Sequence, residues 1–92
     1  MIGLIPQHSF TYDGLQLNVF HANKGEGIIQ HIHPYAHATI CHNGSLIIRM
    51  EAKERVINKD SGAFNLPANQ WHEFEALEDD TVFVNIFSEG KY

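Results

Sequence analysis

The sequence predicts an all-β domain, either a sandwich or a small barrel. Turn-forming residues recur about every ten positions, and the segments between them are rich in β-branched and aromatic residues. No long stretch has the periodicity of an amphipathic helix, and there is no internal repeat. A chain of 92 residues has room for one domain, which we assign to residues 1–92.

Turns or bends separate the expected strands in order. A glycine-rich turn that begins at Asn23 follows the first strand, and Pro34, which has no backbone N–H, ends the second. The later strands are bounded by Asn43-Gly44, by polar turns at 58–62 and 67–69, and by an acidic turn at 78–80. The expected strands cover residues 15–21, 27–32, 38–42, 45–52, 63–66, 71–76 and 81–87.

The clearest local signal is Asn43-Gly44, which stands between two apolar runs. A two-residue type I′ hairpin loop requires positive φ at both positions, and Asn and Gly tolerate this best. The resulting register pairs Ile40 with Ile47 and places Arg49 on the same, outward face. The opposite face is expected to point inward and consists of His37, Thr39, Cys41, Leu46, Ile48 and Met50.

Charge and composition exclude several classes of partner. The formal net charge is -5, and the six Lys and Arg residues form no cluster, so neither nucleic acid nor an anionic membrane is an expected partner. The N-terminal segment lacks a basic region and its apolar run is broken at Pro6, so we expect a cytoplasmic protein without a secretion signal or membrane span. The single cysteine, Cys41, cannot form an internal disulfide.

Three of the seven histidines lie within the segment HIHPYAH at 31–37. On an extended strand, His31 and His33 would share one face with Cα atoms about 6.5 Å apart, close enough for both rings to reach one ion. His37 returns to the inner face, and His72 starts a later strand. Imidazole suits zinc, copper, iron and nickel, so a metal site is favoured over a pair of exposed histidines. The remaining histidines are expected to be surface residues, at positions 8, 21 and 42.

The segment GEGIIQHIHPYAHATICHNG resembles the first motif of the cupin superfamily. Gly25, His31, His33 and Gly44 stand at the spacing of that motif, and His37 takes the place of its usual acidic residue. The segment PANQWH at 67–72 is similar to the second motif, with asparagine at position 69 in place of the usual glycine. A left-handed backbone conformation is tolerated by asparagine better than by most other residues.

This resemblance, to small single-domain cupins with the four-histidine HxHPxxH pattern, implies a double-stranded β-helix, or jelly-roll barrel. It implies one divalent transition metal ion (Fe, Mn, Zn, Ni or Cu) held by His31, His33, His37 and His72, with two positions open to water or substrate. Four neutral imidazoles leave the charge of the ion uncompensated, which favours Lewis-acid chemistry. The resemblance also implies a homodimer.

The expected pocket lining contains no carboxylate, which disfavours general acid–base catalysis by Asp or Glu. It consists of Thr39, Cys41, Ile48, Met50 and Phe74. The catalytic residues are not defined by the sequence, and Tyr35 is a weak candidate proton donor. The favoured function is a metal-dependent oxygenase, an oxidoreductase of dioxygenase type, acting on a small organic molecule. The alternatives are a metal-dependent isomerase or lyase acting on a sugar-derived acid, and a non-catalytic module that binds a metal or small ligand.

Overall fold

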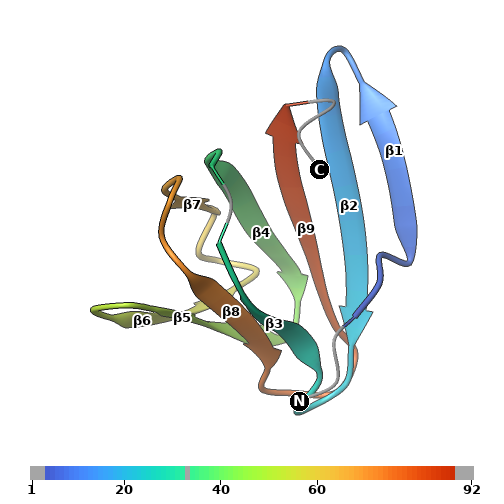
Figure 1. The fold of residues 1–92 in the computed structure, drawn as a ribbon. Coiled ribbons are helices and arrows are strands. Elements are labelled where there is room, and N and C mark those ends of the chain that lie inside the picture. Colours follow the sequence, from blue (N-terminus) through green and yellow to red (C-terminus); the bar gives the residue numbers. More distant parts are fainter. Residues whose placement is uncertain (1–3, 33, 89–92) are drawn as a thin grey trace.

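The computed structural model describes residues 4–32 and 34–88, and within them the chain forms nine β-strands in two antiparallel sheets (Figure 1). The five-stranded sheet has the order β1-β2-β9-β4-β7, and the four-stranded sheet has the order β3-β8-β5-β6. The strands are β1 (His8–Tyr12), β2 (Leu15–Ala22), β3 (Gly27–His31), β4 (His37–Asn43), β5 (Ser45–Met50), β6 (Glu54–Asn58), β7 (Ala63–Leu66), β8 (His72–Ala76) and β9 (Thr81–Ser88). The all-β prediction is therefore confirmed.

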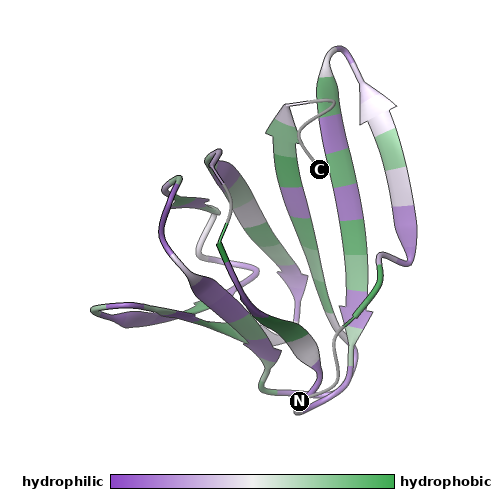
Figure 2. Cartoon of the chain, in the orientation of Figure 1, coloured by the Kyte–Doolittle hydropathy of each residue, from purple (hydrophilic) through white to green (hydrophobic). Residues whose placement is uncertain are grey.

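The two sheets enclose one hydrophobic core. Figure 1 shows them close together where β2 and β8 end and further apart where β4 and β8 begin. Apolar and polar residues alternate over 15–19 of β2 and 73–76 of β8, and the colour bands of Figure 2 show this pattern. Phe20 and Phe83 stack at a centroid distance of 4.9 Å, and the edge of Phe74 meets Phe83 at 5.7 Å. In the described ranges, no helix has the length and apolar character needed to cross a membrane.

Two strands were not predicted, β1 and β6, and both lie at sheet edges. Every residue of β1 is exposed, and in β6 only Ile57 is buried, so neither strand has a buried apolar face. The tight two-residue hairpin turn with both φ angles positive occurs at Asp13-Gly14, with φ values of 51° and 81°, and it joins β1 to β2.

The predicted hairpin at Asn43-Gly44 is wrong. Strand β4 pairs with β7 and β9 in one sheet, whereas β5 pairs with β6 and β8 in the other, so the segment crosses between the sheets. Gly44 has a φ of 74°, and a β-carbon there would overlap Thr81. Ile40 and Ile47 consequently lie on different sheets instead of forming one outer pair.

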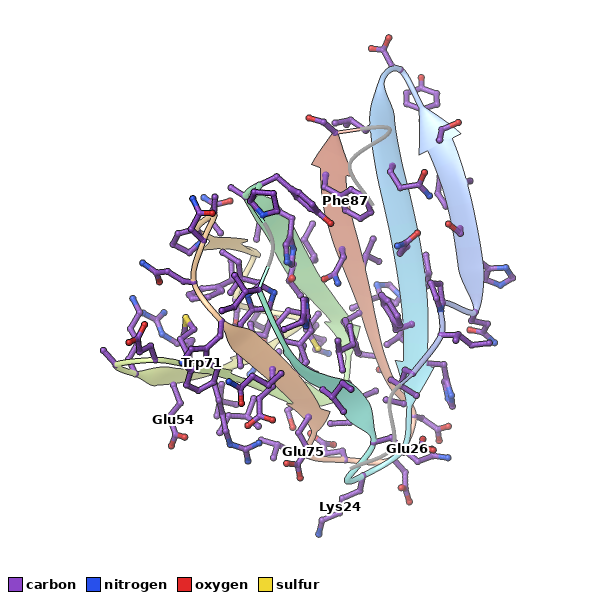
Figure 3. All side chains as sticks on the ribbon, viewed as in Figure 1. Lys24, Glu26, Glu54, Trp71, Glu75 and Phe87 are labelled. Carbon is purple, nitrogen blue, oxygen red and sulfur yellow. The ribbon has the colours of Figure 1, made fainter. Side chains whose placement is uncertain are left out.

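The predicted inward positions are nevertheless correct. Side chains alternate between the two faces of a strand whichever strand it pairs with, so an error in the partner does not change which residues point inward. All six of the residues expected to point inward from 37 to 50 are buried. On β8, His72 and Phe74 are buried, and Glu75 projects to the outer side of its sheet (Figure 3). Arg49 donates a hydrogen bond of 2.9 Å to Glu75, which raises the pKa of the Arg49 guanidinium.

Candidate metal centre

Three of the four predicted ligands stand at the ends of strands. His31 is the last residue of β3 and His72 is the first of β8, and these two are register partners in the four-stranded sheet. His37 is the first residue of β4 in the opposite sheet. The fold therefore brings together side chains that are 35 residues apart in the chain. His33 lies outside the described residues.

The imidazoles of His37 and His72 converge from the two sheets. Their Nε2 atoms are 3.3 Å apart, and both side chains are buried. With metal–nitrogen bonds of about 2.1 Å, this separation corresponds to an angle of about 104° at a shared ion, between octahedral and tetrahedral values. The same distance also allows a hydrogen bond between the two rings. The pair can therefore act as two neighbouring ligands with little movement.

His31 stands beside this pair and is half-buried. The edge of its ring meets His72 at a centroid distance of 4.3 Å, and the His37 and His72 centroids are 5.1 Å apart. Among the described residues, however, no three His, Cys, Asp or Glu side chains already surround a single point as metal ligands. The three histidines nevertheless form a cluster that could bind a metal ion.

Backbone carbonyls fix the tautomers of two of these rings. His31 Nδ1 is 2.9 Å from the carbonyl oxygen of Ile29, and His72 Nδ1 is 3.3 Å from that of Gln70. A carbonyl can only accept a hydrogen bond, so each Nδ1 carries the proton and each Nε2 keeps its lone pair. This arrangement is common for metal-binding histidines, because the second nitrogen is held by an outer hydrogen bond. The donor chemistry therefore fits a divalent transition metal.

Apolar side chains surround the histidine pair. Phe74 stacks on His72 at a centroid distance of 5.5 Å, and Met50 is the register partner of His72 on β5. Of the other predicted lining residues, Thr39 is one inward position beyond His37, while Cys41 and Ile48 belong to the hydrophobic core. Burial raises the pKa of the Cys41 thiol, which donates a hydrogen bond to the carbonyl oxygen of Asn43.

Tyr35 lies in the connection between β3 and β4. Its ring packs at a tilt against Phe87 of β9, with centroids 5.8 Å apart, and it is half-buried. Phe87 itself is buried and stands near the end of β9 (Figure 3). Tyr35 therefore has a defined packing position on the five-stranded sheet.

A cavity of about 490 Å³ was not predicted, and its described lining includes no residue of the histidine cluster. Met50 connects the two, because it lines the cavity and pairs with His72. Lys53 gives the cavity a cationic residue from the turn between β5 and β6. Residues in a turn do not alternate between two faces, so the sequence pattern could not predict where Lys53 points. The described lining consists of Met50, Glu51, Ala52, Lys53, Phe64, Asn65, Pro67 and Gln70.

The sequence matches no protein-family model and no curated protein. Solved structures do resemble its fold. A cupin-2 domain protein from Shewanella frigidimarina is 12% identical with a TM-score of 0.74, and the match covers 91% of this chain and 82% of that one. KdgF from a Halomonas species is 22% identical with a TM-score of 0.74, covering 84% and 71%. A cupin superfamily protein from Desulfitobacterium hafniense is 13% identical with a TM-score of 0.73, covering 95% and 83%.

These similarities define the class of protein by its architecture. The chain has the cupin fold, with a histidine cluster where β3 ends and β4 and β8 begin. At these levels of identity the comparisons define the fold and leave the chemistry to the residues themselves.

Proposed function

We propose that the protein is a metal-dependent enzyme that binds one divalent transition metal through His31, His33, His37 and His72. The observation that carries this proposal is the approach of His37 Nε2 to His72 Nε2, at 3.3 Å between two opposed sheets. The backbone hydrogen bond of His72 Nδ1 supports it, since Nε2 is then the ring nitrogen that can coordinate a metal. His33 enters the proposal through its spacing from His31 in the sequence.

We favour an oxygenase acting on a small organic molecule. A redox-active metal held there would supply a centre at which dioxygen and an organic substrate can react. The protein contributes an apolar wall, because Phe74 stacks on His72 and Met50 lies beside it. Such a wall limits the access of water and suits an apolar or aromatic substrate.

A second candidate is an isomerase or lyase acting on a sugar-derived acid. Lys53 favours it, because this residue lines the cavity that Met50 shares, and its ammonium group would pair with a substrate carboxylate. Glu51 lines the same cavity and supplies a carboxylate that can accept a proton. A module that only binds a metal or ligand remains a third outcome of the experiments below.

Measuring the metal content of the protein tests whether the histidines bind a metal ion. Untagged protein would be analysed by plasma mass spectrometry, together with His72→Ala and with His42→Ala, which replaces an exposed histidine. We expect near-stoichiometric metal in the natural protein and in His42→Ala, and its loss in His72→Ala, with circular dichroism verifying the fold of all three. Absence of metal from the natural protein after reconstitution with each candidate ion would refute the proposal.

Two assays separate the candidate reactions. Oxygen consumption by iron-loaded protein with a panel of aromatic substrates would support the oxygenase. Conversion of uronic acids followed by NMR, lost in Lys53→Met but retained in Lys24→Met, would support the isomerase or lyase, because Lys24 is an exposed lysine in the turn between β2 and β3. Bound metal with neither activity would favour the binding module.

We further propose that two copies associate through the outer face of the five-stranded sheet. Phe10, Tyr12 and Leu15 are exposed on the β1–β2 part of this face. The face continues through apolar positions of β2, β9 and β4, namely Leu17, Val19, Val84, Ile86 and Ile40. None of these positions carries a charge, although the protein as a whole has a net charge of -5, so a second copy can approach here with little electrostatic repulsion.

A further inference from the structure

A row of polar side chains crosses the inner face of the five-stranded sheet. Thr39 of β4 is the register partner of Asn85 of β9, which is the partner of Asn18 of β2. All three residues are at most 5% exposed, although their neighbours along the same face are mainly apolar. Burying amide groups in such surroundings is unfavourable unless hydrogen bonds compensate, so the partners of each atom are informative.

The hydrogen bonds of the row occupy the oxygen atoms of both asparagines. Thr39 Oγ1 donates to Asn85 Oδ1 at 2.7 Å, and Ser9 Oγ donates to Asn18 Oδ1 at 2.6 Å. Gln16 Nε2 donates to the same Asn18 oxygen at 3.1 Å and to Ser9 Oγ at 2.7 Å. Within the described ranges, the hydrogen bonds of the two asparagine side chains use only Oδ1, which leaves both Nδ2 groups as donors.

A cavity of about 440 Å³ opens at the β1–β2 end of this row. Its described lining is Pro6, Ser9, Gln16 and Asn18, and none of these is charged. A hydroxyl and two carboxamides can both donate and accept hydrogen bonds, which matches a ligand with several hydroxyl groups. A carboxylate would be a poorer match, since none of these side chains neutralises its charge.

This row is separate from the histidine pair. From strand geometry, the Cα atom of Asn85 is about 8 Å from that of His37, and that of Asn18 is about 12 Å away. A small molecule can therefore occupy the polar cavity without contacting the histidines. The inference goes beyond the proposed function and does not depend on metal binding.

We propose that Asn18, with Ser9 and Gln16, forms a binding site for a neutral, hydroxyl-bearing small molecule of the carbohydrate type in this cavity. The Asn18 Nδ2 group donates to a ligand oxygen, and the Ser9 hydroxyl and the Gln16 carbonyl form the outer part of the site. The hydrogen bonds that Asn18 Oδ1 accepts from Ser9 and Gln16 hold its carboxamide in the orientation that presents this donor.

NMR titration of metal-free, ¹⁵N-labelled protein tests the site, with methyl β-D-glucoside as the probe. D-glucuronate provides a charged comparison, and cyclohexanol provides one with a single hydroxyl group. We expect saturable shifts of the Asn18 side-chain NH₂ signals with the glucoside, and weaker binding of both comparison compounds. Because the protein is metal-free, loss of binding here would leave the metal proposal intact, and failure of the metal proposal would not alter this result.

Variants complete the test. Asn18→Leu should weaken glucoside binding by about tenfold or more, as expected for the loss of a buried hydrogen-bond donor. Gln16→Met, at a half-buried position that tolerates change more readily, should weaken it as well, whereas Gln30→Leu at an exposed amide of β3 should not. The proposal is overturned if the Asn18 signals do not move, if glucuronate binds more tightly than the glucoside, or if Gln30→Leu has the same effect as Gln16→Met.

Discussion

Gly44 and Gly62 have almost the same backbone conformation but very different surroundings. Their φ values are 74° and 72°, in the left-handed region that side chains disfavour. A β-carbon at Gly62 would meet no atom within 4 Å. At Gly44 it would overlap Thr81 Oγ1 and stand 3.0 Å from Thr81 Cα. The pair therefore separates the effect of backbone conformation from that of packing.

Gly62→Ala should lower the free energy of unfolding by about 1–2 kcal/mol, which is the usual effect of placing a β-carbon in the left-handed region. Gly44→Ala adds steric overlap, for which a further loss of about 1–3 kcal/mol is typical. The single hydrogen of the overlapped hydroxyl faces the carbonyl oxygens of Glu78, at 2.9 Å, and Ser45, at 3.3 Å, so moving it would weaken its hydrogen bonding. We expect a total loss of about 2–5 kcal/mol for Gly44→Ala.

Urea unfolding followed by the fluorescence of Trp71, the single tryptophan, would measure both changes. Adding Thr81→Ala to Gly44→Ala should restore part of the loss, because it removes the overlapped oxygen, and a double-mutant cycle would quantify this coupling. Equal losses in the two glycine variants would refute the reasoning, as would a Gly44→Ala loss that Thr81→Ala leaves unchanged.

Three further predictions concern the thiol, the metal and the dimer. The raised pKa of buried Cys41 means that the folded protein keeps this proton at pH values where the unfolded chain loses it, so stability should fall as the pH rises through and above 9.0, by at most about 1.4 kcal/mol per pH unit. Urea titrations should show this slope reduced in Cys41→Ala, and an unchanged slope would contradict it. Zn²⁺ should raise the melting temperature of the natural protein and of His42→Ala more than that of His72→Ala, and chelator should reverse the shift. Equal shifts in all three proteins would count against the histidine cluster. In analytical ultracentrifugation the natural protein should sediment at about twice its monomer mass of 10.4 kDa, and Val84→Lys should sediment as a monomer, whereas a monomeric natural protein at micromolar concentration would exclude the dimer.

The alternation of side chains between the two faces of a strand explains why much of the candidate site could be predicted. Alternation along a strand depends only on local backbone geometry, so His37 and Thr39 could be placed on the inner face even though their partner strands were wrong. The left-handed conformation expected of Asn69 is also local, and its φ of 63° confirms it.

Other features depended on contacts between distant parts of the chain. Both faces of β9 are apolar, so its sequence does not indicate that Asn85 points inward beside Thr39. Edge strands such as β1 bury too little surface to leave a hydrophobic pattern. Lys53 enters a cavity wall only because the turn after β5 approaches the segment that follows β7.

The sequence by itself determined the all-β class, seven of the nine strands in the described ranges, the inward side of the strands from 37 to 50 and the histidines that could meet, because these follow from local periodicity and residue chemistry. Only the tertiary structure decided that Asn43-Gly44 crosses between sheets, and that His37 approaches His72 from the opposite sheet to within 3.3 Å. The physical reason is that each strand can pair with several strands that are distant in the sequence. The pairing that forms is the one that buries the most apolar surface in the whole fold, and a short segment does not contain the sequence of its possible partners.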